Sequence, residues 1–420
     1  MLYYLFEYLA THFDFGGENL YKFLSIRAGL SFILSLIISI QFGKGIINKL
    51  RKLQVGETVR DLGLAGQLEK SGTPTMGGII ILLAIVVPTL LFAKVLNIYI
   101  TTMIVATVFL GCIGFADDYI KVFKKDKKGL HGKFKILGQV VVGIFVGLVM
   151  LLHNDISFVM GKSEAESRGY EIVNTYRANN PSNVKEKIEY ATVNSSLTNV
   201  PFLKGNELDY SRLLWFLDAD EAVRYAWVVF IPIVVLIITG VSNGANLTDG
   251  IDGLATGTSA IIGAAIGILA YLSGNVISAN YLNILYQPQS GEMIVYAAAF
   301  IGGCIGFLWY NSYPAQVFMG DTGSLMLGGA IATMAILIRK ELLIPILCGI
   351  FLVESLSVIL QVSYFKYTRK KYGEGKRIFL MSPIHHHYQK LGIPEPKIVT
   401  RFWIIGLMLA ALTIITLKIR

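Results

Sequence analysis

Residues 98–119 read IYITTMIVATVFLGCIGFADDY. Residues 98–116 of this stretch carry no charge, and Asp117 and Asp118 follow them directly. A helix needs about 20 mostly apolar residues to cross a bilayer, and residues 98–116 meet that requirement. Charged side chains are expensive inside a membrane, so two acids at the end of such a run require a reason. The stretch therefore predicts a membrane-spanning helix that carries two carboxylates at one end.

The rest of the chain repeats this apolar pattern. It is 54% hydrophobic and 15% charged, with a mean hydropathy of +0.59, which is too apolar for a soluble protein of 420 residues. We expect an all-α polytopic membrane protein, one domain over residues 1–420, with the lipid bilayer as a partner and no nucleic-acid partner. About ten runs are long and apolar enough to span, and they centre near residues 23–41, 75–93, 98–116, 134–152, 224–241, 254–272, 293–309, 324–338, 342–365 and 401–418.

Basic residues gather in alternate connections between these runs. The first, third and ninth connections, at residues 42–73, 117–133 and 366–400, are rich in Lys and Arg, whereas the second and eighth are very short. The positive-inside rule places such odd-numbered connections in the cytoplasm, and ten spans then leave both termini outside.

Acidic and His-rich motifs fall in the same odd-numbered connections. Residues 246–253 lie in the fifth, residues 318–324 in the seventh, and Pro383–His387 in the ninth. Because charge bias and motif position are independent signals, their agreement predicts one polar site on the cytoplasmic face. Such a site suits a cation and a phosphorylated substrate.

The fourth connection is long, and its parity places it outside. We expect residues 153–221 to form a small extracytoplasmic insertion. Its Thr192–Leu208 part alternates apolar and polar residues around Gly205-Asn206, which predicts a hairpin.

Asp117 and Asp118 admit two interpretations. Adjacent residues on a helix point about 100° apart, so the two carboxylates cannot share one role. One would face a metal or a phosphate while the other binds a lysine. The alternative is an acidic helix end that faces the lysines at 121–128.

Asn246, Asp249 and Asp252 are spaced by three residues. On a helix this spacing places an amide and two carboxylates on one face, which suits Mg²⁺, a nucleoside or both. The alternative is a turn between two spans, where Asp, Asn and Gly are common.

Asp321 precedes a predicted span, beside Gly320 and Gly323. It is either a metal carboxylate next to glycines that admit phosphate oxygens to the backbone, or a helix N-cap. Asn311, at the end of the preceding span, could join it.

The histidines and lysines of the motifs carry similar alternatives. Three histidines, His385, His386 and His387, follow Pro383. They either hydrogen-bond phosphate oxygens or lie on the surface without a function. Lys70 and Thr75 flank a Gly- and Pro-rich span entry and can bind phosphate, although a lone lysine there is commonly a snorkelling anchor. The same two interpretations apply to Lys121 and Lys133 in the third connection and to Lys135 just after it.

The ordered set of motifs resembles the polyprenyl-phosphate hexose-1-phosphate transferase family over most of the chain. The resemblance rests on residues 70–78, 115–119, 246–255, 311–324 and 383–387, and the Pro-Ile-His-His-His string favours the muramoyl-pentapeptide branch over the N-acetylglucosamine branch. The long fourth connection departs from the shorter one expected of the family, which puts extracytoplasmic contacts in doubt but not the active site.

The resemblance implies an enzyme of peptidoglycan synthesis in the bacterial inner membrane. It would transfer phospho-N-acetylmuramoyl-pentapeptide from its UDP carrier to undecaprenyl phosphate, giving lipid I and UMP, with Mg²⁺ as cofactor and a homodimer as a candidate assembly. The implied catalytic residues are Asp117, Asp118, Asp321 and Lys70, with Asp321 as metal ligand and Asp117 as a second candidate ligand. The implied substrate-binding residues are Thr75, Lys121, Lys133, Asn246, Asp249, Asp252, Asn311, Phe318, His385, His386 and His387.

Two further functions stay open at this stage. One is transfer of N-acetylglucosamine-1-phosphate to a polyprenyl phosphate. The other is an ion-coupled transporter, whose acids would sit near the membrane midplane rather than at one interface. The sequence also leaves open whether phosphoryl transfer takes one step or passes through an aspartyl-phosphate intermediate.

Overall fold

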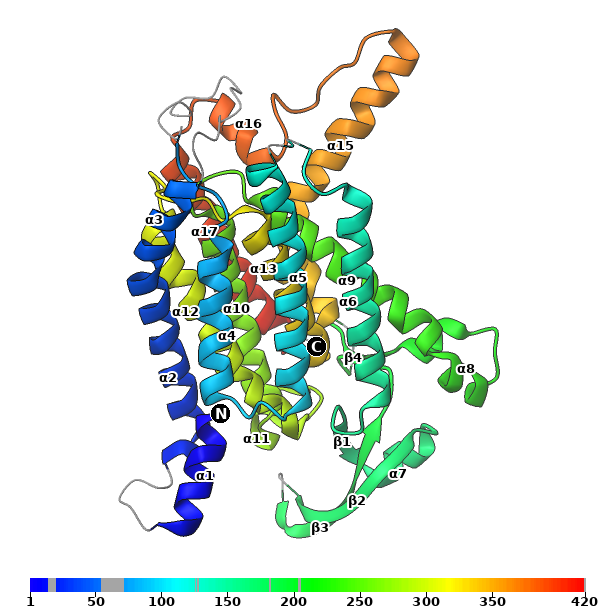
Figure 1. The fold of residues 1–420 in the computed structure, drawn as a ribbon. Coiled ribbons are helices and arrows are strands. Elements are labelled where there is room, and N and C mark those ends of the chain that lie inside the picture. Colours follow the sequence, from blue (N-terminus) through cyan, green and yellow to red (C-terminus); the bar gives the residue numbers. More distant parts are fainter. Residues whose placement is uncertain are drawn as a thin grey trace.

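The protein is a bundle of long apolar helices with a small β-rich insertion at one end (Figure 1). The computed structural model describes residues 1–13, 20–53, 72–124, 126, 128–180, 183–202 and 205–418. Within these residues nine helical segments are long and apolar enough to cross a membrane, and α4 (Gly78–Phe92) is a shorter apolar helix of 15 residues. The ten expected spans are therefore all helical.

The bundle helices follow the hydropathy pattern, except in the run at residues 342–365. They are α2 (Leu24–Ile37), which continues through the π-turn η2 (Ile38–Phe42) into α3 (Gly43–Leu53), then α4, α5 (Ile98–Phe123), α6 (Gly132–Leu152), α9 (Trp227–Thr248), α10 (Leu254–Ser273), α12 (Met293–Asn311), α13 (Gly320–Leu337), α15 (Gly349–Tyr372) and α17 (Glu395–Thr416). Shorter helices are α1 (Leu2–His12), α11 (Val276–Leu282), α14 (Ile344–Leu347) and α16 (Ile384–Lys390), with 3₁₀ turns η1 (Leu20–Lys22), η5 (Pro288–Glu292) and η6 (Glu341–Leu343). The run at residues 342–365 is divided among η6, α14 and α15, and α15 extends beyond it to Tyr372.

Helix α13 lies at the centre of the bundle. Buried residues make up 89% of its most apolar stretch, and it packs against α4, α5, α9 and α10. Small residues permit this close approach: a Cβ on Gly114 of α5 would lie 2.2 Å from the Asp321 carbonyl oxygen of α13. The contact brings the acidic end of α5 against the first turn of α13.

Asp117 and Asp118 do not end their helix. Helix α5 continues beyond the apolar run to Phe123. The connections after α5, α9, α12 and α15 nevertheless gather at one end of the bundle, the upper end in Figure 1. The expected grouping of the motifs at one end is thereby confirmed.

The insertion lies at the opposite end of the bundle. It contains β1 (Phe158–Gly161), α7 (Lys162–Ser167), β2 (Glu171–Asn180), β3 (Asn183–Asn194), β4 (Leu197–Asn199), β5 (Glu207–Asp209), η4 (Tyr210–Leu214) and α8 (Ala219–Tyr225). Strand order β1-β3-β2 forms an antiparallel sheet, and β4 pairs with β5.

The predicted hairpin around Gly205-Asn206 exists as the β4–β5 pair, with positive φ at both residues. Its strands are only three residues long, whereas the longer β2–β3 hairpin was not predicted. Strand β4 also contacts the bundle, because the Asn199 N–H donates to the Arg339 carbonyl oxygen at 3.0 Å.

Candidate active site

Three aspartates form the centre of the polar end of the bundle. One carboxylate oxygen from each of Asp117, Asp118 and Asp321 lies within 4.8 Å of the others. Asp117 and Asp118 are buried, and the Asp321 side chain is 14% exposed. The cluster therefore joins two helices that are about 200 residues apart in sequence through carboxylates that solvent reaches mainly at Asp321.

Asp118 binds the N-terminal end of α13. Its Oδ1 accepts from the Asp321 N–H at 3.1 Å, and its Oδ2 accepts from the N–H and hydroxyl of Thr322 at 2.9 and 2.6 Å. Asp321 itself lies in the first turn and not at the N-cap position, which Met319 occupies. The N-cap alternative for Asp321 is therefore wrong, because Asp118 from another helix satisfies these orphan amides.

Asp117 and Asp321 share two lysines. Lys135 Nζ lies 2.9 Å from Asp117 Oδ1 and 2.5 Å from Asp321 Oδ2. Lys121 pairs with Asp117 and lies 3.3 Å from Asp321 Oδ2. Two ammonium groups thus face two carboxylates, so the charges of these four side chains balance within the site.

Lys133 lies elsewhere. Residues two positions apart on a helix point about 200° away from each other, so Lys133 and Lys135 cannot both face the aspartates. The structure turns Lys135 inward and leaves Lys133 exposed in the first turn of α6. The sequence offered both lysines, but only packing against α5 distinguishes them.

The residues at 246–253 do not share a helical face. Helix α9 ends at Thr248, so Asn246 lies on its last turn while Asp249 and Asp252 lie in the following turn. The predicted face is wrong because the chain leaves the helix between the first and second of these residues. The turn alternative is the observed one.

Asn246 and Asp249 still reach the aspartate cluster. Asn246 Nδ2 donates to Asp321 Oδ1 at 2.9 Å and to Ser324 Oγ at 2.8 Å. Burial, together with the neighbouring carboxylates of Asp321 and Asp118, raises the pKa of Asp249 to about 8.

Asp252 and Asn311 connect loops beside the site. Asp252 Oδ2 accepts from the Ala315 N–H at 3.0 Å. Asn311 Oδ1 accepts from the Gly253 N–H at 3.1 Å, and its Nδ2 donates to the Val317 carbonyl at 3.0 Å. These contacts hold the turn after α9 against the connection between α12 and α13.

Thr75 and Phe318 lie where two motifs run side by side. The Phe318 N–H donates to the Pro74 carbonyl at 2.8 Å, and the Gly77 N–H donates to the Phe318 carbonyl at 2.9 Å. A Cβ on Gly320, whose φ is +72°, would lie 2.9 Å from Thr75 Oγ1 and 2.6 Å from Asp118 Oδ2. Thr75 is thus adjacent to the cluster, and Lys70 lies outside the described residues.

The three histidines follow Ile384 at the start of α16, but they differ in their surroundings. His385 is fully buried, with Nδ1 3.0 Å from Glu354 Oε2 of α15. Its ring packs on the turn after α9, because a Cβ on Gly250 would lie 2.1 Å from His385 Nε2. His386 and His387 are half-buried; His386 Nδ1 lies 2.7 Å from Gln389 Oε1, and His387 Nδ1 accepts from the Leu380 N–H at 3.2 Å.

Glu354 was not considered from the sequence, and Lys135 was considered with Lys121 and Lys133 but was not included among the expected site residues. Glu354 could have been found as the lone acid within the apolar run at residues 342–365, since an acid there is expensive without a partner.

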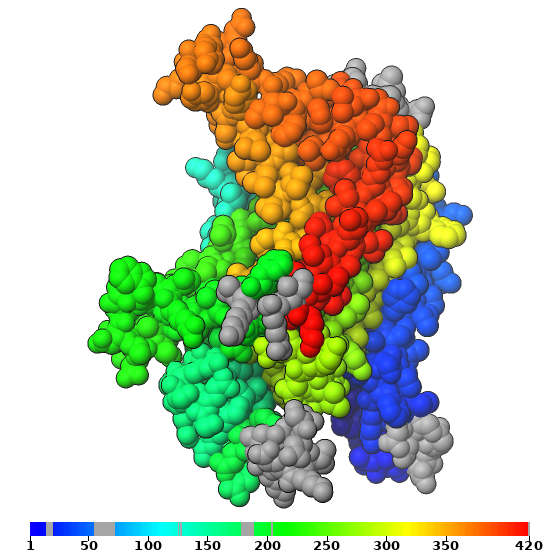
Figure 2. Space-filling view, turned by 180° about the vertical axis from the view of Figure 1, so that it is seen from behind, coloured from blue at the N-terminus to red at the C-terminus, as the bar shows by residue number. Residues whose placement is uncertain are grey.

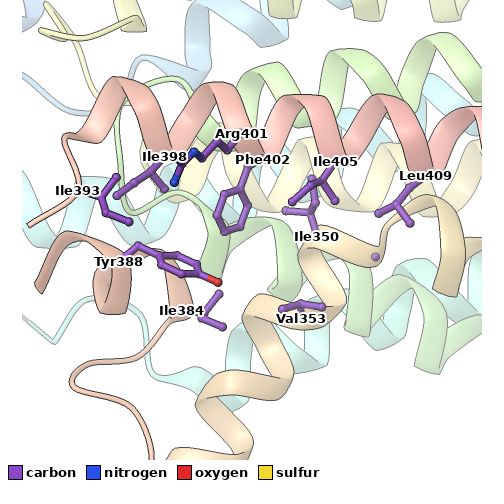
Figure 3. A pocket seen from close by; sticks show the side chains of 11 residues that line it. Ile350, Val353, Ile384, Tyr388, Ile393, Ile398, Arg401, Phe402, Ile405 and Leu409 are labelled. Carbon is purple, nitrogen blue, oxygen red and sulfur yellow. The ribbon is translucent and has the colours of Figure 1, made fainter. Parts of the chain in front are cut away.

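An apolar cavity of about 420 Å³ lies between α15, α16 and α17. Figure 3 shows Ile350, Ile398 and Ile405 among its lining side chains, with Tyr388 and Arg401 as its polar groups. Helix α16, which carries the three histidines, therefore forms part of the cavity wall through Ile384 and Tyr388.

Sequence comparisons with known proteins show which family this fold and site belong to. Glycosyl transferase family 4 matches residues 100–339, which include Asp117, Asp249 and Asp321. The fold and site are thus those of a membrane-embedded transferase of glycosyl transferase family 4.

More similar proteins define the family further. A phospho-N-acetylmuramoyl-pentapeptide-transferase signature matches residues 70–82. The chain is 57% identical to the phospho-N-acetylmuramoyl-pentapeptide-transferase of Flavobacterium psychrophilum, 58% to that of Parabacteroides distasonis and 56% to that of Flavobacterium johnsoniae, in each case over 100% of both chains. The chain belongs to the phospho-N-acetylmuramoyl-pentapeptide-transferase family.

Proposed function

We propose that the protein transfers phospho-N-acetylmuramoyl-pentapeptide from its UDP carrier to undecaprenyl phosphate, forming lipid I and releasing UMP for peptidoglycan synthesis. The observation that carries this proposal is the Asp117–Lys135–Asp321 arrangement in a chain that matches its relatives over full length. Phosphoryl transfer requires charge neutralisation and alignment more than covalent chemistry.

The two lysines supply part of that neutralisation. Lys121 and Lys135 lie at the exposed side of the aspartates, where each is partly accessible to a ligand. A diphosphate that enters between them would exchange carboxylate partners for phosphate oxygens. Asn246 would keep Asp321 oriented while the lysines move.

The donor set suits Mg²⁺. All candidate ligand atoms are carboxylate oxygens, and Mg²⁺ prefers one or two carboxylates plus phosphates and water. Asp118 has both oxygens occupied by α13, so Asp321 and Asp117 are the residues that would hold the ion. When bound, Mg²⁺ would supply charge stabilisation for the diphosphate and the UMP leaving group.

Asp117 is the group that we assign to the acceptor phosphate. It either orients this phosphate or removes its proton, and an aspartyl-phosphate route remains the alternative. The apolar cavity between α15, α16 and α17 has the chemistry required for the isoprenoid tail. A lipid tail there would enter from the bilayer beside α16.

We further propose that the aspartate end of the bundle faces the cytoplasm of a bacterial inner membrane, with both termini outside. The lysine-rich connections support this orientation. In a background without native cysteines, Cys at Lys124 should be labelled by an impermeant reagent only from the cytoplasmic side, and Cys at Tyr176 only from outside. Labelling of both from one side would contradict this topology. A homodimer stays a prediction.

The direct test is release of UMP in purified, reconstituted protein. We expect release from the UDP-muramoyl-pentapeptide donor that depends on both undecaprenyl phosphate and Mg²⁺. Faster turnover with the UDP-N-acetylglucosamine donor would instead support the N-acetylglucosamine branch. Ion uptake without UMP release would support a transporter, although the acids lie near the end of α5 and in the first turn of α13 and not at the middle of either helix.

A further inference from the structure

A group of large apolar side chains is exposed where the insertion returns to the bundle. We name residues 211–228, which include α8, the aromatic arm. Trp215 is 84% exposed and Phe216 is 66% exposed, and Tyr225 and Trp227 are also exposed. Exposed aromatic groups this close together are unusual on a surface that faces only water.

The arm is held in place by its other face. Leu214, Ala222 and Ala226 are buried. At its base the Tyr210 hydroxyl donates to Glu341 Oε1 at 3.0 Å, and the Tyr210 ring lies 5.5 Å from that of Phe230 in α9. The aromatic side chains are therefore presented by an anchored segment and do not belong to a loose tail.

The arm projects sideways from the bundle. Figure 1 shows α8 pointing away from the helices, at the level of β4 and the end of α6 and above the β1–β3 sheet. Figure 2 shows the same segment in green, protruding from the side of the molecule. A projection at the end of the spans lies where a bilayer meets water.

The exposed face continues into the lipid-facing surface of the adjacent span. Val228 and Leu236 of α9 are exposed, Leu236 by 70%, in a helix apolar enough to cross the membrane. Charged residues are exposed on the same arm, among them Asp218, Asp220 and Glu221 at the start of α8. An element that exposes both apolar and charged side chains is more stable at the interface between membrane and water than in lipid alone or in water alone.

We propose that the aromatic arm lies in the boundary between headgroups and acyl chains, in the leaflet on the insertion's side of the membrane. Trp and Tyr favour this boundary because their rings are apolar and their N–H and O–H groups are polar. The continuity with α9 favours lipid over a second copy of the chain. The arm would thereby hold the insertion at the membrane surface.

Tryptophan fluorescence in phosphatidylcholine vesicles tests this placement. The emission of Trp215 is the difference between the parent and Trp215→Phe, a conservative change on an exposed side chain. We expect acyl chains brominated near the headgroup to quench most of this emission, with weaker quenching by bromine near the methyl end or by aqueous iodide. The matched control is Trp215→Phe with Tyr176→Trp, which moves the indole to β2, where iodide should quench it and brominated lipid should not.

Two results would overturn the proposal. Quenching of Trp215 by iodide but not by brominated lipid would place the arm in water. Protection from both quenchers that disappears on dilution of protein into excess lipid would show a second copy on the arm instead.

Discussion

Asp118 on α5 receives both the N–H and the hydroxyl of Thr322 on α13 at one carboxylate oxygen, at 2.9 and 2.6 Å. This contact joins Asp118, the second acid of the motif at residues 115–119, to Thr322, which follows Asp321 in the motif at residues 318–324. It fixes the first turn of α13, and hence the Asp321 carboxylate, relative to Asp117. Asp118 is therefore a positioning residue in the structure.

Asp118→Asn should reduce both stability and activity. The amide turns an NH₂ group toward backbone donors, which leaves buried N–H groups unpaired at a cost of about 1–3 kcal/mol. UMP release and thermal unfolding measure the two effects. Asp126→Asn, an exposed acid after α5, is the control and should match the parent. Full stability in Asp118→Asn would show that the contact does not hold α13.

Lys135→Met should lower turnover by about 10²-fold, the usual cost of removing one preorganised charged donor. Lys135 bridges Asp117 and Asp321, whereas Lys133 is exposed on the same turn. Lys133→Met is thus a control of the same type and helix, and it should turn over near the parent rate. Equal losses in the two variants would rule out a special role for Lys135.

Asp321→Asn should abolish most activity while the protein stays folded, because Asp118 continues to bind the α13 amides. The lost charge should weaken Mg²⁺ binding, since carboxylate is the preferred protein ligand of this ion. A Mg²⁺ titration of UMP release measures the effect. Near-parent turnover at limiting Mg²⁺ would remove Asp321 from the ligand set.

Gly250→Ala should displace His385, because the added Cβ would lie 2.1 Å from its Nε2. A small displacement in an active site can cost about 10²-fold in rate. Gly240→Ala on α9 is the control, because its Cβ would meet nothing within 4 Å. If Gly250→Ala turns over like Gly240→Ala, the position of His385 has no bearing on the reaction.

Asp249 should make stability fall as pH rises. Its pKa is raised from 3.8 to about 8, so the folded state holds a proton that the unfolded state releases between these values. The contribution to stability is complete below pH about 4 and declines up to pH about 8. Thermal unfolding across this range without divalent cations should therefore show a smaller decline in Asp249→Asn. An unchanged slope would contradict the raised pKa.

The candidate site was predictable as a set of motifs but not as a set of contacts. Charge bias and motif parity placed residues 117, 249, 321 and 385 at one end of the bundle, and in the structure Asp117 meets Asp321 while His385 packs on the turn after α9 that carries Asp249. The helical face proposed for Asn246, Asp249 and Asp252 failed, because spacing by three cannot reveal where α9 ends. Lys135 and Glu354 were not selected, because their partners lie on other helices.

Composition and hydropathy were enough to predict the membrane class and the ten apolar spans, because burial of apolar side chains in lipid depends only on local composition and length. The sequence also predicted which connections share a side, since each span reverses the chain. The tertiary structure alone decided that Asp118 caps α13, that Lys135 rather than Lys133 reaches the aspartates, and that His385 packs on Gly250. These contacts depend on how closely two helices approach. That approach is set by small residues such as Gly114 and Gly320 on opposing surfaces, which one-dimensional periodicity does not encode.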